Sequence, residues 1–82
     1  MPEWRAELAR SAAKQLAALD AVARKRVRAC IDRLPEGDVK KLKGQGALFR
    51  ARAGDMRVLF QIDSSTQLIQ VTAVLPRDKA YQ

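Results

Sequence analysis

Residues Leu48–Ile62 read LFRARAGDMRVLFQI, in which apolar and polar side chains alternate on both sides of a Gly-Asp pair. A two-residue period is typical of β-strands with one buried face, and Gly-Asp between two such runs is typical of a tight hairpin turn. The sequence therefore predicts a β-hairpin with Gly54 and Asp55 in its loop. Its core face is predicted to carry Phe49, Ala51, Ala53, Met56, Val58, Phe60 and Ile62.

The opposite face of this hairpin carries arginines. With a two-residue loop, Ala53 pairs with Met56, and Arg52 lies directly across from Arg57, with Arg50 two residues earlier on the same face. Like charges directly opposite each other destabilise a sheet. Two interpretations follow, and the alternation does not decide between them: a solvated basic surface, or a site that binds an anion.

The residues before the hairpin predict one strand and two helices. Alternation over Glu3–Leu8 is typical of a half-buried strand. Ser11 is a candidate N-cap for a short alanine-rich helix that runs to Leu19. Asp20 is a candidate N-cap for a second helix that runs to about Leu34, with apolar residues at helical spacing on one side.

The residues on either side of the hairpin predict a loop and a further strand. Glu36–Gln45 is polar and contains glycine, so we expect a basic connection there. After a turn at Asp63–Thr66, Gln67–Leu75 alternates as a strand that ends at Pro76, which has no backbone N–H to donate. This strand is expected to face inward with Ile69, Val71, Ala73 and Leu75.

The order of these elements predicts an α+β domain. An N-terminal strand, a helical hairpin packed on one face of an antiparallel sheet, and a C-terminal three-strand meander give one sheet with one covered face. The arginine face is then expected to be free for binding. The 82 residues suffice for one domain, residues 1–82.

Composition narrows the possible chemistry. Sixteen Lys and Arg against nine Asp and Glu give a formal net charge of +7, which favours a polyanionic partner such as RNA, DNA or an acidic protein segment. Histidine is absent and Cys30 is the only cysteine, so we expect no disulfide, no metal and no cofactor, and Cys30 as a small core residue. No apolar run approaches the roughly 20 residues that span a bilayer, so we expect a cytoplasmic protein.

Three segments together resemble the RelE/ParE toxin superfamily. They read LKG at 42–44, LFRARAGDMRVLF at 48–60 and VLPRDKAY at 74–81. The family pattern runs strand, helical hairpin, a basic K-L-x-G loop, a Y-R-x-R-x-G-D-Y-R-V-x-Y hairpin and a closing R-x-x-x-Y. The hairpin is the specific part of the resemblance, which covers nearly the whole chain.

The resemblance implies the toxin of a bacterial type II toxin–antitoxin system, with a cognate antitoxin protein as partner in a hetero-oligomer. RelE-like members cut mRNA in the ribosomal A site without metal, using basic side chains on the sheet to grip the phosphate that the RNA's own 2′-hydroxyl attacks. ParE-like members inhibit DNA gyrase. Carried onto this chain, the resemblance implies Arg57, Arg77, Tyr81 and Arg52 as catalytic residues and Arg50, Lys43 and Lys41 as RNA contacts.

Elementary chemistry is compatible with the nuclease. Phosphoryl transfer needs positioning and stabilisation of charge on the phosphate oxygens, which planar guanidinium groups supply. Arg50 and Arg52 remain protonated, so they can only clamp charge. Tyr81 either transfers a proton or stacks on a base and packs the C-terminus, and the sequence does not decide between these roles.

The sequence favours the ribosome-dependent mRNA endoribonuclease and leaves two alternatives open. In a ParE-like gyrase inhibitor, the arginine face is a protein interface and performs no chemistry. In a generic RNA-binding protein, affinity falls steeply with salt and no product forms. The chain offers few aromatic side chains on which bases could stack, which disfavours the last alternative.

Overall fold

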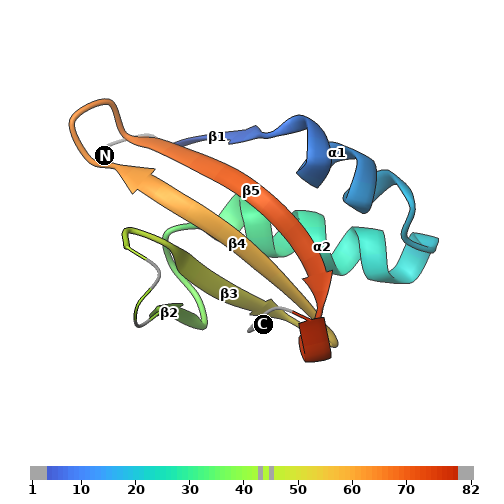
Figure 1. Cartoon of the computed structure of the whole chain (residues 1–82). Coiled ribbons are helices and arrows are strands. Elements are labelled where there is room, and N and C mark those ends of the chain that lie inside the picture. The colour runs from blue at the N-terminus through green and yellow to red at the C-terminus, as the bar shows by residue number, and fades with distance from the viewer. Residues whose placement is uncertain (1–3, 43, 45, 80–82) are drawn as a thin grey trace.

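In the part of the chain that the structure describes, a five-stranded sheet with both α-helices on one face forms the fold (Figure 1). The computed structural model describes residues 4–42, 44 and 46–79. None of the helices in these ranges is long and apolar enough to cross a membrane. The elements are β1 (Arg5–Leu8), α1 (Arg10–Ala17), α2 (Ala21–Arg33), β2 (Val39–Lys41), β3 (Phe49–Ala53), β4 (Met56–Asp63), β5 (Leu68–Pro76) and the 3₁₀ turn η1 (Arg77–Lys79).

The sheet has the strand order β1-β5-β4-β3-β2. The last three long strands, β3, β4 and β5, are antiparallel neighbours, as the predicted meander requires, and β1 joins β5 in parallel. In Figure 1 α2 lies behind the sheet and α1 lies beside β5 where β1 ends, so no helix of the described residues covers the front face. The predicted α+β architecture is confirmed, with one correction: β1 is parallel to β5, so the sheet is mixed and not wholly antiparallel.

The central hairpin has the predicted register. Ala53 pairs with Met56 and Arg52 with Arg57, and Gly54 takes the left-handed backbone conformation, φ +63°, that a tight hairpin turn needs. The predicted core face does contact the helices. Ala51, Ala53, Val58 and Phe60 are buried in the core cluster, and Phe49, Met56 and Ile62 pack against it.

Strand β5 departs from the predicted alternation at Thr72. The register shifts there, because Phe60 pairs with Val71 but Leu59 pairs with Ala73, which leaves Thr72 as an extra residue. A bulge of this kind reverses the faces of the residues that follow it. Ile69 and Val71 are therefore buried as predicted, whereas Val74 faces the core in place of Ala73 and Leu75, for which the prediction was wrong.

Where β1 ends, side chains of helix α1 form hydrogen bonds with the edge of β5. The pairing of β1 with β5 stops at Val71. Beyond it, the Ser11 hydroxyl donates to the carbonyl oxygen of Thr72 at 3.1 Å, and the Val74 N–H donates to the Gln15 side-chain oxygen at 2.7 Å. These side chains satisfy backbone groups that would otherwise lack partners.

Two predictions about α1 were therefore wrong in detail. The helix begins at Arg10, its N-cap is Ala9, and no side chain caps it. Ser11 lies inside the first turn and bonds to β5, so it is not the N-cap. The helix also ends at Ala17, two residues before the predicted end at Leu19.

Helix α2 follows the sequence prediction closely. The Asp20 carboxylate accepts from the Ala23 N–H at 2.8 Å, as an N-cap does. Val27 and Ile31 are buried against the sheet. Cys30 is half-buried and packs against the core, and burial raises the pKa of its thiol, which keeps it protonated near neutral pH.

The predicted loop at Glu36–Gln45 contains a strand, which is a further correction. Strand β2 pairs antiparallel with β3, with Val39 opposite Ala51 and Lys40 opposite Arg50. Its three residues are too few to show a period, so composition alone favoured a loop. This pairing adds a fifth strand and brings the end of the α2–β2 connection beside the arginines.

Substitution of Gln15 by Ala is expected to destabilise the protein, because it leaves the Val74 N–H without its acceptor. The expected loss is roughly 1–2 kcal/mol in the free energy of unfolding. Lys14→Ala, one residue earlier on the exposed side of α1, is the matched control and should change stability little. Urea unfolding followed by circular dichroism measures both. Equal midpoints for the two variants would contradict the assigned role of Gln15.

Candidate nucleic-acid interface

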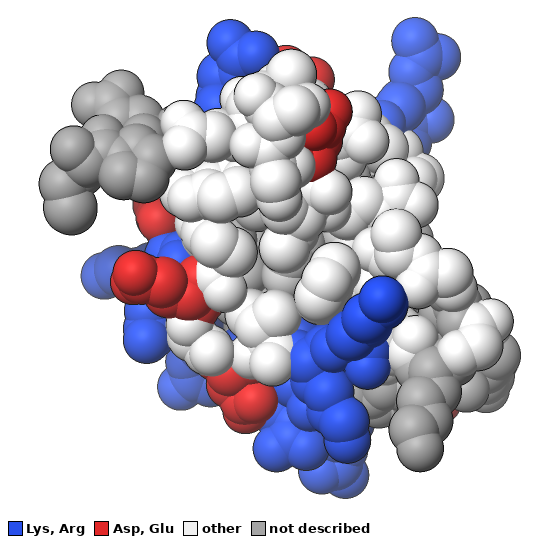
Figure 2. Space-filling model, turned by 90° about the vertical axis from the view of Figure 1, so that its left-hand side faces the viewer, with Lys and Arg blue, Asp and Glu red and all other residues white. Residues whose placement is uncertain are grey.

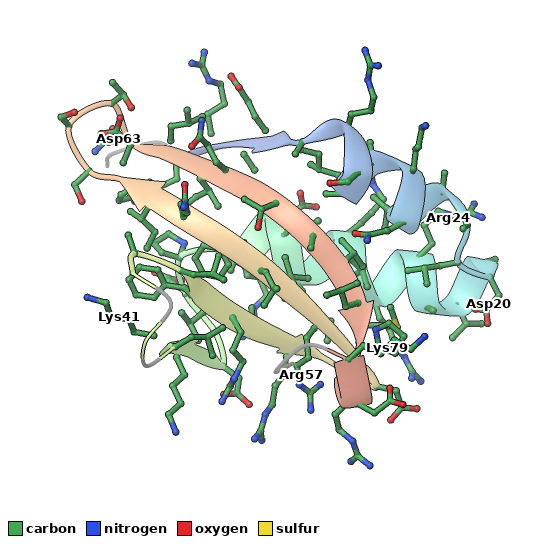
Figure 3. All side chains as sticks on the ribbon, in the orientation of Figure 1. Asp20, Arg24, Lys41, Arg57, Asp63 and Lys79 are labelled. Carbon is green, nitrogen blue, oxygen red and sulfur yellow. The ribbon has the colours of Figure 1, made fainter. Side chains whose placement is uncertain are left out.

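The β3–β4 hairpin places Arg50, Arg52 and Arg57 on the face of the sheet that carries no helix. We call these three residues the arginine cluster. Arg52 and Arg57 are cross-strand partners, and Arg50 pairs with Leu59 one step along the same face. Figure 3 shows Arg57 in front of the sheet, near the start of β4 and beside η1. The facing guanidinium groups expected from the sequence are therefore present.

The three arginines of the cluster differ in how far they are buried. Arg50 and Arg57 are each only 5% exposed, whereas the side chain of Arg52 is 54% exposed. Arg50 lies between Lys40 of β2 and Leu59 of β4, but the ladder of β2 stops before Arg52. The expectation of a freely exposed arginine face was therefore wrong for two of the three side chains. A desolvated cation needs hydrogen-bond partners or an anion.

The β3–β4 turn supplies the partners of Arg57. Its Nη1 donates to the carbonyl oxygens of Gly54 at 2.9 Å and Met56 at 2.8 Å. Its Nε is buried and has no hydrogen-bond partner in the described part of the chain. Backbone carbonyls thus fix the guanidinium and leave its buried Nε without a partner, and the buried Nε of Arg50 likewise has none in the described residues.

Asp38 supplies an acidic partner for the other two arginines. Arg50 Nη1 donates to the Asp38 carbonyl oxygen and to Asp38 Oδ1, both at 3.2 Å. Arg52 Nη1 lies 3.7 Å from Asp38 Oδ2. Part of the negative charge that the facing arginines require therefore comes from the chain itself.

Sequence reasoning missed Asp38 and Lys40, and the cause was the missed strand β2. Only the pairing of β2 with β3 shows that Lys40 lies beside Arg50. Asp38 directly precedes β2, so the same pairing places it near Arg50 as well. A glycine-aspartate pair before a short Val-Lys-Lys run was the available signal, and it is weak without a register.

The remaining predicted site residues differ in where they lie relative to the arginine cluster. Arg77 is exposed in η1, and its backbone N–H donates to the Asp55 carbonyl oxygen at 2.9 Å, so the same turn that holds Arg57 also anchors Arg77. Lys41 pairs with Phe49, on the opposite face from Arg50, and Figure 3 shows it at the β2 edge, away from Arg57. Lys43 and Tyr81 lie outside the described residues.

Positive charge also gathers around the β2 end of the sheet. Figure 2 looks at this side of the molecule and shows Lys and Arg side chains grouped on its lower part, while uncharged residues cover most of the upper part. Lys40, Lys41 and Arg52 are exposed residues of β2 and β3. Such a concentration attracts a polyanion and raises the rate at which it associates.

Comparison with known proteins identifies the fold. The sequence matches no protein-family model and no curated protein sequence. The structure is similar to the archaeal RelE–RelB complex from Pyrococcus horikoshii, with 29% identity over 94% of this chain and 98% of that chain, and a TM-score of 0.73. It is also similar to the RelBE2 toxin–antitoxin complex of Mycobacterium tuberculosis, with 23% identity, coverage of 90% and 98%, and a TM-score of 0.80.

The isolated RelE toxin of Escherichia coli has the same architecture. It matches at 13% identity over 95% of this chain and 88% of that chain, with a TM-score of 0.73. The structural neighbours are thus RelE toxins of type II toxin–antitoxin systems. The chain has the RelE-like toxin fold, and the family resemblance read from the hairpin is confirmed at the level of the fold.

Removal of the Asp38 side chain is expected to destabilise the fold. In Asp38→Ala the buried Arg50 loses its carboxylate, and we expect a loss of about 1–3 kcal/mol in the free energy of unfolding. Arg52→Ala removes a half-exposed side chain and should stay within about 0.5 kcal/mol of the wild type. Thermal and urea unfolding measure both. An Asp38→Ala protein as stable as Arg52→Ala would show that Arg50 does not depend on Asp38.

Proposed function

We propose that this protein is the toxin of a type II toxin–antitoxin system and that it cleaves mRNA on the ribosome as a metal-independent endoribonuclease. The observation that carries the proposal is the arginine cluster on the helix-free face, in which Arg57 is desolvated, fixed by backbone carbonyls and left with an unused Nε donor. The RelE-like fold supports it.

The chemistry proposed for the site is attack of an RNA 2′-hydroxyl on the adjacent phosphorus. The 2′-oxygen bonds to phosphorus, the bond to the 5′-oxygen of the next nucleotide breaks, and a 2′,3′-cyclic phosphate is left. Negative charge on the phosphate oxygens increases in the transition state, so fixed guanidinium groups at low local dielectric stabilise it. A base must accept the 2′-hydroxyl proton, and an acid must give a proton to the leaving oxygen.

The residues of this chain take the following roles in the proposal. Arg57 and Arg77 stabilise the phosphate, because both are anchored to the β3–β4 turn, and Arg52 clamps the same charge from the neighbouring strand. Tyr81 is the candidate acid or base. Arg50, Lys41 and Lys43 contact the RNA backbone in the prediction from sequence, although Arg50 already donates to Asp38.

The proposal includes a protein partner. The similar structures from Pyrococcus horikoshii and Mycobacterium tuberculosis are toxin–antitoxin complexes. By analogy, we propose that this chain binds a cognate antitoxin as a hetero-oligomer in the cytoplasm, where ribosomes and mRNA are found. An acidic or amphipathic antitoxin segment would complement the exposed lysines and arginines.

The proposed activity is tested by primer extension on mRNA translated in a cell-free system. Wild-type protein should produce cuts inside codons that disappear when ribosomes are left out. Arg57→Ala should reduce cleavage by about 10²–10³-fold, since it removes a preorganised donor to the transition-state charge. Arg52→Ala should reduce it by at least about tenfold without loss of stability, and Tyr81→Phe tests proton transfer.

Arg28→Ala is the matched control for these variants. Arg28 is an exposed arginine on α2, behind the sheet, so the variant changes the net charge equally but leaves the arginine cluster intact. It should cleave like the wild type. Intact mRNA with all proteins, together with blocked DNA gyrase supercoiling in a parallel reaction, would replace the nuclease by the gyrase-inhibitor alternative.

A further inference from the structure

The position of Asp38 is fixed by backbone hydrogen bonds to β3. Its carbonyl oxygen accepts from the Arg52 N–H at 3.1 Å, and Gly37 before it has a φ of +106°, which bends the chain into β2. Val39, after it, begins β2 opposite Ala51. The Asp38 carboxylate is therefore held beside the arginine cluster by the fold and does not reach it from a long, free loop.

The carboxylate binds its two arginines unequally. Oδ1 lies 3.2 Å from Nη1 of Arg50, whose side chain is 6% exposed. Oδ2 lies 3.7 Å from Nη1 of Arg52, which is longer than a hydrogen bond, and that side chain is 54% exposed. Arg50 thus donates hydrogen bonds to Asp38 through Nη1, whereas Arg52 is held only by a loose, solvated ion pair.

We infer that the Asp38 carboxylate occupies one anion position of the arginine cluster, and that a substrate phosphate must compete with it for Arg52. Asp38 thereby lowers the affinity of the site for RNA and reserves Arg50 for a positioning role. This inference rests on the proposed function, because it takes RNA as the polyanion that binds the cluster.

The charges in the cluster indicate that Asp38 and a phosphate compete for Arg52, and that Asp38 does not simply neutralise the arginines. The three guanidinium groups carry three positive charges, and Asp38 is the only carboxylate that forms an ion pair with any of them in the described residues. An incoming phosphate would gain Arg52 while being repelled by the Asp38 carboxylate nearby. Because Arg52 is half-exposed and loosely bound, it is the arginine that can turn to the phosphate with least loss.

The test is Asp38→Asn, measured by binding of a short single-stranded RNA labelled with a fluorophore. The carboxamide keeps an oxygen that accepts from Arg50 Nη1 but removes the negative charge, so the fold is retained, and unfolding measurements check this. RNA should bind roughly three- to tenfold more tightly at low salt, and the slope of log K against log salt should steepen by up to about 0.7, as for one additional phosphate contact with a single strand.

Asp32→Asn is the matched control. Asp32 is an exposed residue of α2, behind the sheet, so its substitution raises the net charge by the same amount away from the cluster. It should change RNA affinity less than twofold. Equal effects of the two variants, or weaker RNA binding by Asp38→Asn, would overturn the inference while leaving the proposed function standing.

The same experiment separates this inference from the proposed function. If Asp38→Asn binds RNA more tightly than Asp32→Asn but neither the variants nor the wild type cleave mRNA, the inference holds and the nuclease proposal fails. If no form of the protein binds RNA at any salt concentration, the inference fails, and primer extension with ribosomes still decides the nuclease proposal. Tighter binding by Asp38→Asn together with ribosome-dependent cleavage supports both.

Discussion

The cross-strand pairing of β3 with β4 around Gly54 and Asp55 is the constraint on which the rest of the structure depends. Its register sends Val58 and Phe60 to the helices and Arg52 and Arg57 to the opposite face. A shift of one residue would exchange these sets and place arginines in the core. The carbonyl oxygens of the same turn then hold Arg57 and anchor η1 through Arg77, so one short turn positions both the core and the candidate site.

The arginine cluster lowers the stability of the fold and is able to bind an anion. Buried cations destabilise a fold unless hydrogen bonds or anions compensate them. Here Asp38 compensates Arg50 and backbone carbonyls compensate Arg57, each only in part, since the Nε atoms of both arginines lack a hydrogen-bond partner in the described residues. Groups left unsatisfied in this way are common at functional sites, where the ligand completes the hydrogen bonding. A phosphate has the charge and the acceptor oxygens to do so.

The parts of the fold that could be predicted from sequence are those set by strong local signals. The Gly-Asp turn between alternating runs predicted the hairpin and its register, and Asp20 before a helical pattern predicted the start of α2. The parts that failed depend on long-range pairing. Thr72 bulges against β4, so the residues of β5 that follow it face the opposite way. Ser11 does not cap its helix, because its hydroxyl donates to the carbonyl oxygen of Thr72, which is distant in sequence.

The candidate site could be predicted only in part, for the same reason. Alternation showed that Arg50, Arg52 and Arg57 share a face, but it gave no account of their burial, which depends on the strands on either side. Strand β2 is too short to be recognised from three residues, and without it neither Lys40 nor Asp38 could be placed beside Arg50.

The central claim, that the arginine cluster binds the phosphate of RNA, is tested most directly by nuclear magnetic resonance of the arginine Nε–H groups during titration with a short RNA. We predict that the signals of Arg57 and Arg52 move most, because both guanidinium groups belong to the cluster that binds the phosphate. Changes confined to the α2 arginines, such as Arg24 and Arg28, with Arg57 unchanged, would contradict it.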